Sequence, residues 1–123
     1  MVELMIAVAV IGLLAAIAIP SFVRARTTSQ ASACINNLRQ IDDASQEWAL
    51  DNHKAAEASV MFTDIQSYLK NAIICPATGP GATFAVSYTL TTVSNKPACN
   101  VVPATHVLPP DPSQSGSPHV SPF

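Results

Sequence analysis

Residues 4–23, LMIAVAVIGLLAAIAIPSFV, largely determine how this chain is built. The stretch holds 20 residues, and none of them is charged. An α-helix of this length reaches about 30 Å, the thickness of a bilayer's hydrocarbon core. A small domain has too little surface to cover a helix that is apolar on every side. We therefore expect a helix that can lie in a membrane rather than the core helix of a globular protein.

A cleaved secretory signal peptide is the other common source of such a stretch. It fits poorly, because the apolar run is too long for the hydrophobic part of a signal peptide and no basic segment precedes it. Arg24 and Arg26 follow the run instead. The pattern favours a helix that stays in the protein.

The composition leaves only a small globular part. The chain has 123 residues and a formal net charge of −2, and 11% of its residues are charged, against roughly 25% in soluble domains. A core built from residues of about 30–100 is marginal, so a staple or oligomerisation is expected to support it. The six basic residues form no patch beyond Arg24 and Arg26, which argues against nucleic acid as a partner.

The apolar helix is predicted to continue as an amphipathic one. Apolar or small residues recur at steps of three and four, at Ala31, Cys34, Ile35, Leu38, Ile41, Ser45 and Trp48. No glycine or proline lies between Ser21 and Ser59, so the two parts can form one rod of roughly 70 Å. Gly12 and Pro20 are the weak points, and we expect a kink or an unwound stretch on the N-terminal side of Pro20.

The segment after the long helix predicts a small α+β head. Residues 59–70 indicate a short helix, and residues 75–81 carry a dense turn signal. Residues 83–93 alternate as a strand does, residues 98–102 can pair back antiparallel, and a third strand could come from 72–74 or 105–108. The amphipathic half of the helix is expected to pack on this small antiparallel sheet.

Four segments result from this division. They are a hydrophobic helix for a membrane or filament core (1–23), an amphipathic helix (24–54), a globular head (55–108) and an extended Pro/Ser-rich tail (109–123). The serines of the tail allow O-glycosylation on composition alone, at Ser113, Ser115, Ser117 and Ser121.

Residues 2–22, VELMIAVAVIGLLAAIAIPSF, closely resemble the N-terminal segment of type IV pilins and of the related type II secretion pseudopilins. The matching features are a glutamate after the first residues, an unbroken run of small and branched apolar residues, and the Ala-Ile-Pro-x-Phe end. The helix to about His53 supports the resemblance. The runs at residues 34–39 and 75–99 match pilin-like proteins less specifically, and nothing beyond residue 100 matches.

The resemblance implies an inner-membrane precursor whose leader is removed by a prepilin peptidase and whose new N-terminal amine is methylated. Assembly machinery would then lift subunits into a helical filament, a pilus or fimbrium, with bundled hydrophobic helices at its core. Met1 stands where the family has a leucine, two residues after the usual mature end, and lies at the assembly end. The family's glutamate corresponds to Glu3, which would neutralise the N-terminal amine of a neighbouring subunit.

The same resemblance assigns a role to the helix breakers. Gly12 and Pro20 correspond to the positions between which the helix is commonly melted in assembled pili. Freed backbone groups can be accommodated by the neighbouring helices of a filament core. We expect melting there rather than a simple proline kink.

The three cysteines are Cys34, Cys75 and Cys99. A head outside the inner membrane lies in an oxidising compartment, where disulfides persist. Joining Cys75 to Cys99 would close a loop of about 25 residues and contribute roughly 3 kcal/mol, so this pair is predicted. Cys34 could instead pair with either one, which would leave the third cysteine free.

No metal ion and no other cofactor are expected. No two cysteines are close in sequence, and the three histidines, His53, His106 and His119, are isolated from one another. The sequence carries no phosphate loop, no Gly-x-Ser-x-Gly and no His-Glu-x-x-His motif, so we expect no enzyme.

Three functions follow as hypotheses. The first is the structural subunit of an extracellular type IV pilus-like filament, drawn from an inner-membrane pool and bound to identical subunits. The second is the major pseudopilin of a type II secretion system, which acts in the periplasm. The third is a single-pass membrane-anchored binding module that does not polymerise. Glu3 separates the third from the others, because a plain anchor gains nothing from a carboxylate there.

Overall fold

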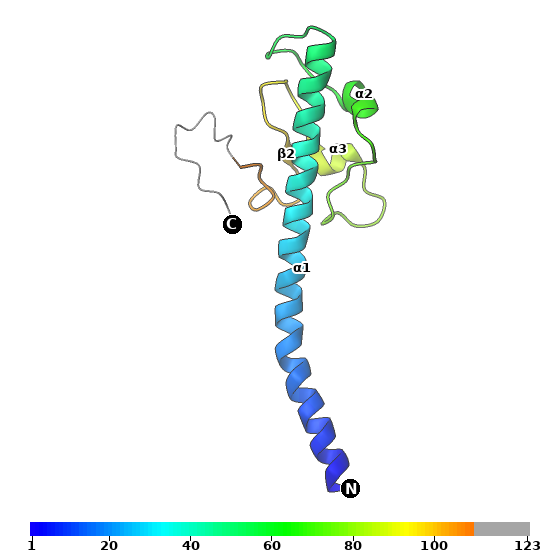
Figure 1. Ribbon diagram of the computed structural model, residues 1–123, viewed down its shortest axis with the longest axis vertical. Coiled ribbons are helices and arrows are strands. Elements are labelled where there is room, and N and C mark those ends of the chain that lie inside the picture. The colour runs from blue at the N-terminus through cyan, green and yellow to red at the C-terminus, as the bar shows by residue number, and fades with distance from the viewer. Residues whose placement is uncertain (110–123) are drawn as a thin grey trace.

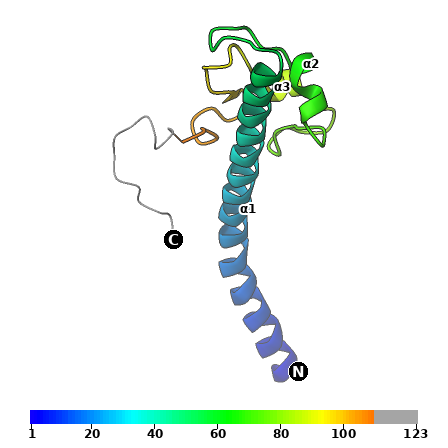
Figure 2. The same ribbon diagram turned by 45° about the horizontal axis from the view of Figure 1, so that its top comes forward.

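One helix, α1 (Val2–Asp51), runs along most of the molecule (Figure 1). The computed structural model describes residues 1–109 of the chain. Its other elements are α2 (Phe62–Ile65), the 3-10 helix η1 (Gln66–Tyr68), α3 (Phe84–Ser87), β1 (Tyr88–Thr89) and β2 (Ala98–Cys99). These elements lie around the C-terminal half of α1, and its N-terminal half projects away from them (Figures 1 and 2). The predicted α+β class is confirmed.

The predicted single rod is also confirmed. α1 has 50 residues and continues through both Gly12 and Pro20. Its axis bends in the N-terminal half (Figures 1 and 2), where Pro20 lacks the N–H that a helix interior normally uses. The single chain therefore has no unwound stretch before Pro20. Melting between Gly12 and Pro20 in an assembled filament stays a prediction.

The amphipathic stripe lies against the head as its spacing predicts. Cys34, Leu38 and Ile41 are fully buried, and Ser45 is buried with them. The remaining members of the stripe, Ala31, Ile35 and Trp48, are partly buried. The stripe packs against a small cluster from the head: Val60, Ile65, Ile73, Cys75, Tyr88 and Cys99.

The strand predicted at residues 83–93 is wrong over most of its length. Residues 84–87 form α3, and only Tyr88–Thr89 is a strand, paired antiparallel with Ala98–Cys99 in the register Tyr88 to Cys99. Phe84 is half-buried while Ser87 and Tyr88 are buried, which is the three-and-four spacing of a helix. Val86 is exposed, although the alternating pattern would have placed it inward.

The rest of the predicted sheet is reduced in the same way. Among the described residues neither 72–74 nor 105–108 forms a strand, and an isolated bridge joins Ser59 to Thr92 instead. The short helix predicted at 59–70 appears as α2 and η1. Asp64 caps its start, because the Met61 N–H donates to the Asp64 carboxylate at 3.0 Å. The head is therefore mostly loop held against α1. The predicted Pro/Ser-rich tail lies, from residue 110 on, outside the described residues.

Candidate functional site

The N-terminal half of α1 exposes its apolar side chains on all sides. Every residue from 1 to 29 is exposed, including Leu4, Ile11 and Phe22. Among the described residues α1 is the one helix long and apolar enough to cross a membrane, and no part of its apolar stretch is buried within the chain. Water-exposed apolar surface of this extent marks a contact with lipid or with other protein.

The residues predicted to act in assembly lie on this exposed half. Glu3 sits in the first turn of α1, beside Met1, which is 98% exposed. Within residues 1–109 the Glu3 carboxylate has no hydrogen bond or ion pair, so any partner must come from outside the described chain. Gly12 has open space where a Cβ would stand, so the single chain gives no packing reason for a glycine there.

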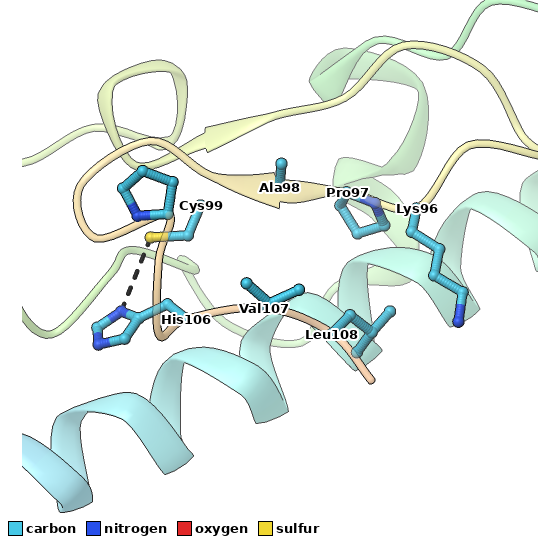
Figure 3. A pocket seen from close by; sticks show the side chains of 8 residues that line it. Lys96, Pro97, Ala98, Cys99, His106, Val107 and Leu108 are labelled. Atoms are coloured by element: carbon cyan, nitrogen blue, oxygen red, sulfur yellow. Dashed lines mark hydrogen bonds between the residues drawn. The ribbon is translucent and has the colours of Figure 1, made fainter. Parts of the chain in front are cut away.

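A second group of side chains is buried in the head. Cys34, Cys75, Cys99 and His106, here called the Cys3His cluster, place their sulfur and nitrogen atoms within 4.8 Å of one another. All four residues are buried, and none of the cysteines is more than 2% exposed. Figure 3 shows the Cys99 sulfur pointing at the His106 ring. Sequence reasoning treated His106 as isolated, and the fold corrects that.

Four separate pieces of backbone build the cluster. Cys34 comes from the middle of α1, and Cys99 ends β2. Cys75 begins a turn closed by the Thr78 N–H donating to the Cys75 carbonyl at 3.0 Å. His106 ends a second turn, in which its N–H donates to the Val102 carbonyl at 3.0 Å. The cluster is therefore a junction between α1 and three parts of the head.

The predicted disulfide between Cys75 and Cys99 is not formed. Their sulfur atoms are 3.7 Å apart, whereas a disulfide bond needs about 2.05 Å, and all three cysteines are free. The His106 Nδ1 atom lies 3.5 Å from the Cys75 sulfur and 3.8 Å from the Cys99 sulfur. The two cysteines are neighbours, as predicted, but they share their surroundings with Cys34 and His106.

Two polar side chains, Asn37 and Tyr88, lie beside the Cys34 end of the cluster. Asn37 uses its Nδ2 group twice, donating to the Ile74 carbonyl at 2.9 Å and to the Tyr88 hydroxyl oxygen at 3.0 Å. The Tyr88 hydroxyl then has its own proton left for the Cys34 sulfur, 3.6 Å away. Either group can be the donor while Cys34 is a thiol, and the hydroxyl would be the donor to a Cys34 thiolate.

Two cysteines of the cluster, Cys34 and Cys99, differ in acidity. Burial is the main reason that the pKa of the Cys34 thiol is raised to about 12, and the Tyr88 hydroxyl opposes the rise. Burial is the largest single influence on the Cys99 thiol and acts to raise its pKa, while the backbone amides of Val102 and Val101 act to lower it. Hydrogen bonds with Cys34 and Cys75 lower it further, and the four lowering influences together bring the pKa of Cys99 below its ordinary value.

The cluster borders a pocket at the surface. Its lining includes Cys99 and His106 at one end and Lys96 at the other (Figure 3). Lys96 holds this region by donating to the Pro109 carbonyl at 2.9 Å. The four serines predicted for O-glycosylation, Ser113, Ser115, Ser117 and Ser121, lie outside the described residues.

Comparisons of this chain with known protein families, with curated proteins and with solved structures give no match.

Proposed function

We propose that this chain is a structural subunit of a type IV pilus-like filament, held in a membrane by its N-terminal helix before assembly. The observation that carries the proposal is the projecting half of α1, apolar on every face and free of the head. A membrane can cover such a rod while the chain is single. A bundle of identical rods can cover it after assembly, which is why the helix suits two successive surroundings.

The exposed carboxylate of Glu3 supports polymerisation over a simple anchor. A buried carboxylate without a partner is strongly unfavourable, so Glu3 needs a positive charge once neighbouring helices surround it. The N-terminal amine of an adjacent subunit would supply that charge and would fix the axial register between the two helices. The head, at the other end of α1, would then form the outer surface of the filament (Figure 1).

Glu3→Leu is expected to abolish filaments while the chain still accumulates in the membrane, because leucine keeps the helix apolar and removes the charge pair. Glu3→Gln, which keeps size and polarity, is expected to reduce filament yield strongly for the same reason. Filaments are counted by electron microscopy of sheared material, and membrane chain is measured by immunoblot. Filament yield at the normal level in Glu3→Leu would contradict the proposed role of Glu3.

A further inference from the structure

We propose that Cys34, Cys75, Cys99 and His106 bind a single Zn²⁺ ion that fastens the head to α1. The cluster brings three sulfurs and one imidazole nitrogen together in a buried site. Tetrahedral sites with three cysteines and one histidine are a common form of structural zinc site. The close approach of all four ligand atoms leaves room for one ion rather than for a cluster of several metal atoms.

The distances among Cys75, Cys99 and His106 match a tetrahedron around zinc, and the Cys34 sulfur lies within 4.8 Å of each of these ligand atoms. With Zn–S of about 2.3 Å and Zn–N of about 2.0–2.1 Å, tetrahedral angles give about 3.8 Å between two sulfurs and about 3.6 Å between sulfur and nitrogen. The Cys75 and Cys99 sulfurs are 3.7 Å apart. The two sulfur–nitrogen distances to His106 are 3.5 and 3.8 Å. Nδ1 is therefore the nitrogen that would bind, and the proton of a neutral His106 would sit on Nε2.

The residue types also favour a metal over a disulfide. A disulfide would use two of the three buried cysteines and leave one thiol without a role, whereas zinc uses all three and the histidine. On binding, the three thiols release three protons to solvent, and each thiolate sulfur donates an electron pair to Zn²⁺. The product carries a net charge of −1, from three thiolates and one divalent ion.

The surrounding donors suit that negative charge. The Tyr88 hydroxyl lies 3.6 Å from the Cys34 sulfur and would donate to it once that sulfur is a thiolate. Such outer hydrogen bonds orient ligands and stabilise thiolates in metal sites. The pocket beside Cys99 and His106 offers a route for the ion from solvent (Figure 3).

Zinc would supply the staple that this head otherwise lacks. The sheet has two strands of two residues each, and most of the head is loop. One ion would join the middle of α1 to the 75–78 turn, to β2 and to the loop that ends at His106. Metal binding to such a site is directly coupled to folding.

The test uses the full chain, purified in detergent under reducing conditions and stripped with a chelator. Addition of Co²⁺ alone is expected to give one ion per chain, with the visible bands of a tetrahedral site and a thiolate charge-transfer band. Zn²⁺ is expected to displace Co²⁺ and so to remove both the visible bands and the charge-transfer band. Cys75→Ser is expected to weaken binding more than about 100-fold, because even outer-shell changes cost roughly 10–100-fold. His53→Asn, at an exposed histidine, is the matched control and is expected to bind normally.

His106→Cys separates a lost site from a lost fold. It turns the site into one with four sulfurs, so binding is expected to persist with an altered Co²⁺ spectrum. The proposal is overturned by the absence of tetrahedral Co²⁺ bands in the reduced chain, or by a His106→Cys spectrum equal to that of the parent. A Cys75–Cys99 disulfide in the chain isolated from cells, found by non-reducing peptide mapping, would also overturn it.

Discussion

In detergent phase separation, a chain that begins at Arg24 is expected to remain in the aqueous phase, whereas the full chain partitions into the detergent phase. The removed segment is apolar on every face and buries nothing against the head. Helical membrane insertion of such a segment is effectively irreversible, so its loss should move nearly all of the protein from one phase to the other. Detergent phase separation followed by immunoblotting measures the distribution.

The same truncation provides its own control on folding. The first buried residue of α1 is Cys34, well beyond the cut, so the head should keep its packing. The thermal midpoint of the shortened chain is expected to equal that of the full chain in detergent within a few degrees. A full chain that remains an aqueous monomer would show that the exposed half of α1 does not enter a membrane.

Leu38→Ala is expected to lower the free energy of unfolding of the head by about 2–5 kcal/mol. Leu38 is fully buried in the middle of the stripe, between Cys34 and Ile41, so the change removes packed methyl groups and leaves a cavity. The total free energy of unfolding of a small domain is about 5–15 kcal/mol, so this loss is a large share of it. Urea unfolding of the chain that begins at Arg24, followed by circular dichroism with Zn²⁺ present, measures it.

Leu50→Ala is the matched control, because it makes the same chemical change in the same helix at a position that is 76% exposed. Leu50→Ala is expected to change the free energy of unfolding by no more than about 0.5 kcal/mol. Equal losses in the two variants would mean that the stripe does not face the head as the structure describes.

The long helix could be predicted from sequence because its signals are local. These signals are the length of the apolar stretch, its lack of charge, and the three-and-four spacing from Ala31 to Trp48. Each can be read from residues within a few helical turns of one another. The same spacing also predicts which positions on α1 are buried. The head is harder to predict, because Phe84, Val86 and Tyr88 also fit an alternating strand. The structure has a helix there, with Phe84 packed against the core and Ser87 buried.

The cluster could not be predicted from spacing because its members are far apart in the chain. Cys75 lies 24 residues before Cys99 and 31 before His106, and Cys34 reaches them only by the packing of α1 on the head. Familiar zinc motifs pair ligands within a few residues. The odd number of cysteines was the one signal available, since no disulfide arrangement uses all three.

We propose above that the apolar half of α1 forms the core of a filament of identical subunits. Electron microscopy of material sheared from cells that make this chain, with mass spectrometry of the purified filaments, tests it most directly. We expect filaments whose main subunit is this chain, with the apolar N-terminal peptide among those identified, and we expect no filaments from Glu3→Leu. Filaments that lack this chain, while it stays in the membrane as a monomer, would show that it is not a filament subunit.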